Sequence, residues 1–480
     1  MDVDSLDMSG GIRTETVLPL ENSWTRYGPV GVWAALLLFL AGWMVLHWYQ
    51  TAILIKHFYN PFPVWDYWRV VSDYPSLKAF HFDVLWRQHN EHRILFPEIV
   101  FQLDMFLCHG RMLVPLVISS FCYTGIWAVL SYCVLSDKSL PLTMRVASVL
   151  LAGGIIGWQG SACVLGQPFL LQWTLSQICA LLALLSSWRD HETGRAKYLI
   201  ACIVFATVAL YSSANGLLLW PVLVVVALMM GIRRHHLYAL GLSAVITLGC
   251  YFVGYHFTRS FNMEAVLDHP VYALESISAY IAMPFSAIKA PIFGVCIGAI
   301  NIALAIVLAI IAIRRRLMAQ ISIVLFGSYA FTLLTGALIV LGRMEPKDRQ
   351  FSDAKAVRYL TTPLVNWAVL ILLLIWIVAR CNWRLITSRG VIVTALILCL
   401  AGFPKLRWWL AWNTANFIRE QTAAIAIENG ITDPIVLRLV FPDPGFVMLF
   451  LPMLKKKHLA IFYHGHSGGL VEAQTIQRLK

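Results

Sequence analysis

Hydrophobic residues along this chain gather in long runs, and short polar loops separate most of them. The first run covers residues 29–49. Ten more follow at 113–135, 146–160, 169–187, 198–212, 216–231, 237–257, 286–313, 319–341, 362–379 and 390–408. Most are close to the ~20 apolar residues that carry an α-helix across the hydrocarbon core of a bilayer. The pattern therefore predicts an all-α polytopic membrane protein with about eleven transmembrane helices.

Two stretches depart from this pattern. In residues 51–111, charged side chains alternate with aromatic ones, as in WDYWR at 65–69. This mixture suits neither a core nor a lipid-facing surface, because each charge needs water or a partner. We therefore expect a long first loop outside the membrane, with a site at the membrane edge. Residues 409–480 alternate short apolar stretches with turns, which predicts a small α/β-like cap outside the membrane.

Basic residues in the short loops predict the orientation. Lys and Arg favour cytoplasmic loops, and alternate loops carry clusters such as those at 233–234 and 314–316. With these loops in the cytoplasm, the long first loop and the C-terminal segment both lie outside. The expected organisation in a bacterial inner membrane is a cytoplasmic tail (1–28), a membrane domain (29–408) with its first periplasmic loop at 51–111, and a periplasmic cap (409–480).

Composition agrees with a membrane location. Of the 480 residues, 59% are hydrophobic and only 13% are charged, and the mean hydropathy of +0.71 is too high for a soluble protein of this length. The net charge of +12 comes from short clusters between the runs, so we expect no nucleic-acid partner. Most of the ten cysteines fall inside or beside apolar runs. The sequence contains no phosphate-binding P-loop, GxSxG elbow or HExxH motif.

Asp66 is the first candidate for chemistry. It lies in PFPVWDYWR, where Pro61 and Pro63 interrupt regular helix and stiffen the chain. Low-dielectric surroundings at the membrane edge would raise the proton affinity of this carboxyl group and suit it to act as a general base. The alternative is that Asp66 only caps the helix that follows.

The second candidate group lies in LWRQHNEHRILFPE, residues 85–98. If this segment is helical, it presents two polar strips. These are Gln88, Glu91 and His92 on one face, and His89 with Arg93 on another. Such strips would hold a sugar hydroxyl, a phosphate or a metal ion, although the spacing matches no recognised metal-ligand pattern. A structural ion pair between Glu91 and Arg87 is the alternative.

The third candidate group is cationic and lies in the late loop at 342–361. Arg343, Arg349 and Arg358, with Tyr359 beside the last of them, break the positive-inside bias if this loop is external. Arginine binds phosphate through two parallel hydrogen bonds, which lysine cannot form. The loop would thus hold the phosphate of a lipid carrier. Contact with anionic lipid headgroups is the alternative.

This layout resembles the C-type integral-membrane glycosyltransferases (GT-C). That superfamily places a long external loop after its first span, with an acidic residue early in the loop, and it uses polyprenyl-phosphate-linked sugars as donors. Asp66 in VWDYW matches the acidic residue by position. Gly342, Arg343, Arg358 and Tyr359 are similar to the basic late loop of bacterial members. The resemblance covers the general arrangement of spans to about residue 408.

The resemblance implies transfer of a sugar, with inversion, from a polyprenyl-phosphate donor to a glycan, lipid or protein acceptor. Asp66 would act as the base and Glu91 as its partner acid. The substrate would be bound by His89, His92, Arg93, Arg343, Arg349, Arg358 and Tyr359. Many relatives carry a second acidic residue where this chain has Tyr67, so a divalent metal ion stays open as a cofactor.

Two other functions compete with this expectation. A flippase for lipid-linked sugars would place charged residues along a path through its spans, whereas the predicted spans are almost free of them. A polysaccharide polymerase or ligase would carry its main external loop late in the chain, whereas here it follows the first span. The asymmetry of charge favours an enzyme that acts on the external face.

Overall fold

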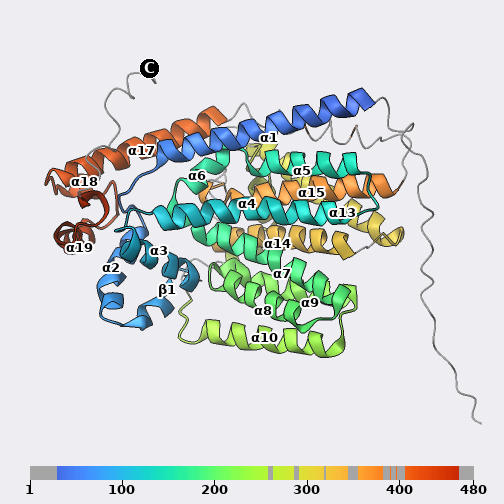
Figure 1. The fold of residues 1–480 in the computed structure, drawn as a ribbon. Helices are drawn as coiled ribbons and strands as arrows, with labels where there is room; N and C mark the ends of the chain where they lie inside the picture. Colours follow the sequence, from blue (N-terminus) through green and yellow to red (C-terminus); the bar gives the residue numbers. More distant parts are fainter. Residues whose placement is uncertain are drawn as a thin grey trace, which may run out of the picture.

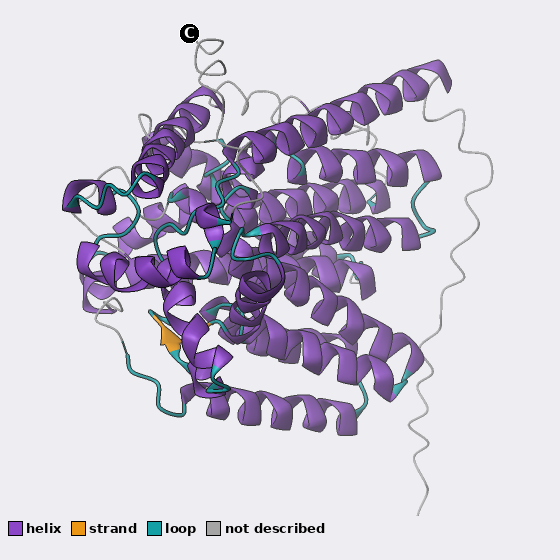
Figure 2. Ribbon diagram, turned by 60° about the vertical axis from the view of Figure 1, so that its left-hand side comes forward, coloured by secondary structure: helices purple, strands orange, loops and turns teal. Residues whose placement is uncertain are grey.

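The structure is a computed structural model that describes residues 30–257, 263–285, 291–317, 320–343, 355–381 and 406–463, together with residues 390 and 396. Within these ranges the protein is all-α apart from one two-stranded hairpin (Figures 1 and 2). The long helices run roughly side by side and form a bundle, as Figure 1 shows.

Six of the described helices are long and apolar enough to cross a membrane. They are α1 (Val30–Phe58), α4 (Leu113–Ser136), α7 (Leu171–Thr193), α13 (Pro291–Arg314), α14 (Gln320–Arg343) and α15 (Thr361–Arg380). A seventh span results if α5 (Leu142–Ile156) and the bent continuation at Gln159–Leu165 form one unit, with a 43° bend between them. The protein is thus a multi-pass helical membrane protein.

By helix length and composition, the described residues give six or seven candidate spans, fewer than the eleven predicted. The runs near 198–212 and 216–231 form helices that are short for a bilayer, and most of the run at 390–408 lies outside the described residues. Between α4 and α15 the described residues also form α6 (Ala162–Leu165), α8 (Ala196–Leu210), α9 (Leu219–Met230), α10 (Arg234–Phe252), α11 (Met263–Asp268), α12 (Pro270–Ile281), and the short 3₁₀ turns η3 (Gln159–Ser161), η4 (Pro168–Leu170), η5 (Ala214–Leu218) and η6 (Val357–Tyr359).

Small residues let α1 approach α5 closely. A side chain at Gly154 would overlap the ring of Trp43. One turn away on α1, the indole of Trp48 donates a hydrogen bond to the carbonyl of Gly153 at 3.0 Å. Inside a bilayer, helix association depends on such close packing and on interhelical hydrogen bonds, since lipid is as apolar as the helix surface. This contact fixes α1, and with it the start of the first loop.

The first loop is shorter than the sequence predicted, because α1 continues to Phe58. The loop folds into α2 (Tyr67–Lys78), the 3₁₀ turn η2 (Phe82–Trp86), strands β1 (Gln88–His89) and β2 (His92–Arg93), and α3 (Leu95–Leu107). A helix over residues 88–93, on which the two predicted polar strips depended, is not formed. The two strands pair antiparallel, with His89 opposite His92. Asn90 opens the two-residue turn with φ of 51°, a left-handed conformation that Asn adopts more easily than most residues.

The C-terminal segment is helical, so the expected α/β-like cap is wrong for the residues that the structure describes. It contains α17 (Leu406–Glu428), α18 (Pro434–Leu437), α19 (Pro444–Lys456) and the turn η8 (Ala460–Phe462). The Asp-Pro pairs that suggested turns begin helices instead. The side chains of Asp433 and Asp443 accept hydrogen bonds from the backbone N–H groups of Ile435 and Gly445, and a proline follows each aspartate at the first helical position.

The first loop and the C-terminal helices share a hydrophobic core of their own. Trp68 and Val71 of α2 and Phe101 of α3 belong to the same buried cluster as Leu437 and Leu454 of the C-terminal segment. In Figure 1 these elements lie together at one end of the bundle. Two segments from opposite ends of the chain therefore build one layer at this end of the bundle, and the candidate residues lie where the layer meets it.

Asp104 joins this layer to the bundle. Its two carboxylate oxygens accept hydrogen bonds from the backbone N–H groups of Met112 and Val114, at 2.6 and 2.9 Å, at the beginning of α4. We expect Asp104→Ala to lower the free energy of unfolding by about 2 kcal/mol, because two buried donors lose their acceptor. Unfolding in mixed detergent micelles measures the change. The exposed Asp83 provides the control, and an Asp104→Ala protein as stable as Asp83→Ala would contradict this role.

Candidate functional site

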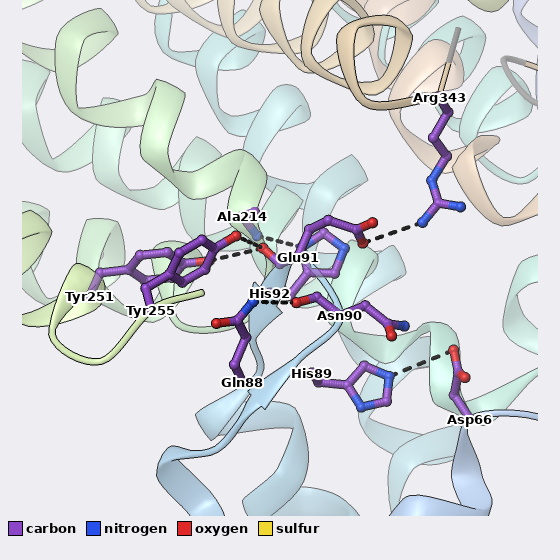
Figure 3. A network of polar contacts seen from close by, with 10 residues as sticks. All are labelled: Asp66, Gln88, His89, Asn90, Glu91, His92, Ala214, Tyr251, Tyr255 and Arg343. Carbon is purple, nitrogen blue, oxygen red and sulfur yellow. Dashed lines mark hydrogen bonds and ion pairs between the residues drawn. The ribbon is translucent and has the colours of Figure 1, made fainter. Parts of the chain in front are cut away.

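The hairpin is fixed to the end of α10. The side-chain amide of Gln88 donates to the carbonyls of Asn90 and His256, both at 2.7 Å, and its oxygen accepts from the N–H of His256 at 2.8 Å. The hydroxyl of Tyr255 donates to the carbonyl of Glu91 at 3.0 Å. Figure 3 shows the contacts of Gln88 with Asn90 and of Tyr255 with Glu91. They hold the turn so that its side chains project away from α10.

Arg93 contributes to the same attachment. Its guanidinium group donates to the backbone carbonyls of Trp86, Tyr251 and Val253, and it stacks 5.2 Å from the ring of Trp86. Only 3% of the residue is exposed. Because its donors are directed to backbone oxygens, we assign Arg93 to positioning the hairpin rather than to contact with a substrate.

Asp66 faces His89 of the hairpin. The imidazole Nε2 lies 3.6 Å from Asp66 Oδ2, with the histidine buried and the Asp66 side chain 46% exposed. Asp66 occupies the position before α2, yet its side chain makes no capping hydrogen bond there. The alternative role as a simple helix cap is therefore not seen. The carboxylate instead faces His89 (Figure 3) and stays partly accessible to incoming groups.

The electrostatics of Asp66 differ from the prediction. Contact with the His89 side chain lowers the pKa of Asp66, and the charges of His89, Arg69 and Arg358 lower it further, while burial acts in the opposite direction. The partners outweigh burial, so the expected rise in proton affinity does not occur. Asp66 is therefore an ionised carboxylate at neutral pH.

The late basic loop meets the early acidic one. Arg358, on η6, is close enough for its charge to act on Asp66, although the two residues are far apart in the sequence. The guanidinium group of Arg358 also lies 4.9 Å from the ring of its neighbour Tyr359. A carboxylate and an arginine from the two predicted groups thus lie within electrostatic reach of each other.

Glu91 pairs with the other end of that loop. Its Oε2 lies 3.4 Å from Nη2 of Arg343, at the last residue of α14 (Figure 3). The alternative partner Arg87 points elsewhere, because it forms ion pairs with Asp73 and Asp83 at 3.2 and 3.6 Å. Glu91 is therefore paired with Arg343, one of the arginines for which the sequence predicted phosphate binding.

His92 is a partly buried, neutral imidazole. Its Nδ1 accepts a hydrogen bond from the backbone N–H of Ala214 at 3.1 Å. Burial lowers the pKa of His92 to about 4; the charges of Glu91 and Asp66 oppose this, and those of His89 and Arg343 reinforce it. All four groups therefore lie within electrostatic reach of this ring. With Nδ1 accepting, the proton sits on Nε2, which makes His92 a fixed hydrogen-bond donor at neutral pH.

A cavity of about 200 Å³ opens beside these residues. Its polar end is formed by Glu91, His92, Asn215, Arg343 and Tyr359. The rest of its wall is mostly apolar or aromatic and includes Trp173, Leu217, Phe252, Tyr255, Phe257, Leu338 and Ile339. Small-molecule sites typically combine an apolar wall with a few placed polar groups. This cavity suits a molecule with a charged or hydroxylated head and an apolar tail.

The described residues offer no cluster of three or more His, Cys, Asp and Glu side chains that could hold a metal ion. The two hairpin histidines differ in environment, since His89 faces Asp66 while His92 binds the N–H of Ala214. The described residues bring carboxylates, imidazoles and guanidinium groups to the site.

Most predicted site residues come together, and two further residues join them. Arg349 lies outside the described residues. Sequence reasoning assigned no role to Arg69, whose charge acts on Asp66, or to Asn215, which lines the cavity. Arg69 stands three residues after Asp66, and this spacing was a usable signal. Asn215 could not be found in this way, because only the tertiary fold brings η5 to the hairpin.

A buried glutamate beneath the site predicts a pH-dependent stability. Burial raises the pKa of Glu98 on α3 from 4.5 to about 7, although the Gln102 amide donates to it at 2.7 Å. Between these two pH values the folded state binds more protons than the unfolded state. Stability should therefore fall by on the order of 3 kcal/mol as the pH rises from about 4.5 to about 7. Glu98→Gln should flatten this part of the profile, measured by unfolding at several pH values, and an unchanged slope would contradict the assignment.

Comparison with known proteins adds no relative. No protein-family model, curated protein or solved structure matches the chain. The classification as a helical multi-pass membrane protein comes from the length and composition of its own helices.

Proposed function

We propose that the protein is a membrane glycosyltransferase that moves a sugar from a polyprenyl-phosphate donor to a glycan, lipid or protein acceptor. The observation that carries the proposal is a mostly apolar cavity lined also by Glu91, His92 and Arg343, with the carboxylate of Asp66 within electrostatic reach of His92. A carboxylate base and a phosphate-binding cation beside an amphiphilic cavity are what transfer from a lipid phosphate requires.

In the proposed reaction, Asp66 accepts the proton of an acceptor hydroxyl group. The acceptor oxygen attacks the anomeric carbon of the donor sugar from the face opposite the phosphate. The bond between that carbon and the phosphate oxygen breaks, and the polyprenyl phosphate leaves with the bonding electron pair. The configuration at the anomeric carbon is therefore inverted. The ionised state of Asp66 supports its role, because only the carboxylate form can take up the proton.

The remaining residues receive roles from their positions. Arg343 and Arg358 stabilise the leaving phosphate, for which arginine is well suited. The phosphate competes with Glu91 for Arg343, so donor binding would release Glu91 to act on the sugar or the acceptor as the partner acid. His92 donates from Nε2 to a sugar or phosphate oxygen, and Tyr359 lines the same polar end.

A flippase is the competing function, and the position of charge favours the enzyme. In the six candidate spans, Lys, Arg, Asp and Glu occur only within the last five residues of the helices. A charged path through the spans, expected of a transporter for a charged headgroup, is absent from these described helices. We place the site on the periplasmic face of a bacterial inner membrane, as the basic clusters of the opposite loops predict.

The test is an assay of purified protein with a panel of polyprenyl-phosphate sugars, read by mass spectrometry of the products. The expected result is consumption of at least one donor, with release of polyprenyl phosphate and a glycosylated acceptor. If every donor stays intact while the protein moves labelled lipid-linked sugar across liposome membranes, the enzyme proposal is wrong and a flippase is correct.

A further inference from the structure

A second, smaller cavity lies beside Asp66, on the side of the C-terminal helices. It lies between the end of α1, α6 and α17, and has a volume of about 40 Å³. Four polar side chains line it, from the first loop, the α6–η4 connection and α17. They are Asn60, Gln167, Asn416 and Glu420. This cavity takes no part in the roles assigned above.

One of these polar groups lacks a partner. Asn60 is 7% exposed, and its side-chain oxygen accepts from the N–H of Phe62 at 3.1 Å. Its amide nitrogen has no hydrogen-bond partner among the described residues. A buried donor without a hydrogen-bond partner destabilises the fold unless a ligand or a water molecule accepts its hydrogen bond. The orphaned amide of Asn60 thus indicates that the cavity receives a hydrogen-bond acceptor.

The cavity is joined to Asp66 through Trp65. The indole N–H of Trp65 donates to Glu420 Oε1 at 3.2 Å, and its backbone N–H donates to the carbonyl of Val440 at 2.7 Å. Trp65 has a positive φ of 52°, and Val64 lines the cavity directly. The backbone that carries Asp66 is therefore held by the C-terminal helices on one side, while His89 of the hairpin faces the carboxylate on the other.

The lining selects a class of ligand. Three amides and one carboxylate offer both donors and acceptors, and no lysine or arginine occurs among the described residues that line the cavity. A phosphate or other anion would therefore be poorly held next to Glu420. Phe58 and Phe417 add an apolar edge, with their rings 5.7 Å apart. The volume admits about three water molecules, which is enough for the hydroxyl groups on one edge of a sugar ring.

We propose that this cavity binds sugar hydroxyl groups of the acceptor, so that the acceptor is a carbohydrate held close to the segment that carries Asp66. This inference rests on the proposed function for its use in transfer. The binding itself does not depend on that function.

Kinetics provide the first test. Gln167→Ala combined with Asn416→Ala removes two amides for which the described residues show no other hydrogen bond, so the fold should be kept. We expect the KM for a carbohydrate acceptor to rise about tenfold, with the KM for the donor and kcat unchanged within about twofold. Asn429→Ala, at the exposed end of the same helix α17, is the matched control. An unchanged acceptor KM in the double variant would overturn the proposal.

Direct binding provides a second test that needs no turnover. In Asn416→Cys protein, held in a detergent without a sugar headgroup, maleimide labelling of residue 416 is followed by mass spectrometry of its peptide. We expect protection by methyl glycosides, and by the same sugars on an alkyl chain if the acceptor is a glycolipid. Inorganic phosphate and a serine peptide should not protect.

The outcomes separate the two proposals. Protection by sugars without consumption of any donor would leave the cavity as a sugar site and reject the transferase. Donor consumption with no protection by any sugar would reject the carbohydrate acceptor and leave the transferase. Protection by the serine peptide alone would also overturn the inference, because it would indicate a protein acceptor.

Discussion

Asp66→Asn should abolish sugar transfer, with a fall in kcat of about 10³-fold, while the protein still inserts and folds. The amide has nearly the shape of the carboxylate but cannot accept the proton of the acceptor hydroxyl, and general-base catalysis typically contributes 10²–10⁴-fold. Transfer is measured with purified protein and the donor that the panel assay identifies. Because the pKa of Asp66 is lowered, the wild-type base should stay ionised across the neutral range.

Asp83→Asn is the matched control for this substitution. Asp83 lies in the same loop, and its side chain is 70% exposed in an ion pair with Arg87, so its loss should leave kcat within about twofold. Donor binding by Asp66→Asn should also persist, since the cavity with Arg343 is intact. Near-normal turnover by Asp66→Asn would remove the proposed base and, with it, the mechanism.

Arg343→Gln should lower kcat/KM for the donor by about 10²-fold. The substitution removes a cation from the leaving phosphate, and a single such donor in an active site is worth 10²–10³-fold in rate. Arg343→Lys should recover only part of this loss, because lysine cannot form the two parallel hydrogen bonds of a guanidinium group. Steady-state kinetics at varied donor concentration measure both variants.

The control for Arg343 is an arginine at a distant position. Arg189 lies near the end of α7 and pairs with Glu192 at 2.6 Å, so Arg189→Gln should transfer sugar normally. Glu91→Gln adds a second check, because it frees Arg343 from its partner and should tighten donor binding even as kcat falls. Equal kcat/KM for Arg343→Gln and wild type would show that the phosphate is held elsewhere.

The hydrophobic pattern was sufficient to predict a helical multi-pass membrane protein. Long apolar runs specify helices without any knowledge of their neighbours, because backbone polar groups in lipid must be satisfied within the segment. The long polar loop after α1 was also visible. The number of spans was harder to predict from the sequence, because α8 and α9 are apolar but short. Apolar composition alone does not distinguish a full span from a shorter buried helix.

The local structure of the site was less predictable. The polar segment around Asn90 gives no strong periodic signal, and the hairpin depends on contacts with Tyr255 and His256, which are far away in sequence. The lowered pKa of Asp66 depends on the same tertiary placement, because His89 becomes its neighbour only when the hairpin forms. The Asp-Pro pairs of the C-terminal segment were interpreted as turns between the short apolar stretches of an α/β-like cap rather than as starts of helices.

The layer shared by the first loop and the C-terminal helices has a consequence for biosynthesis. Trp68 and Phe101 leave the ribosome long before Leu437 and Leu454, which complete their cluster. The acceptor of the Trp65 backbone N–H, the Val440 carbonyl, is also made late. Until the C-terminal helices are synthesised, the apolar side of α2 that they cover stays exposed and is a target for chaperones or proteases. The segment that carries Asp66 therefore reaches its final packing only after these helices have been made, and a chain terminated before them should insert without this layer.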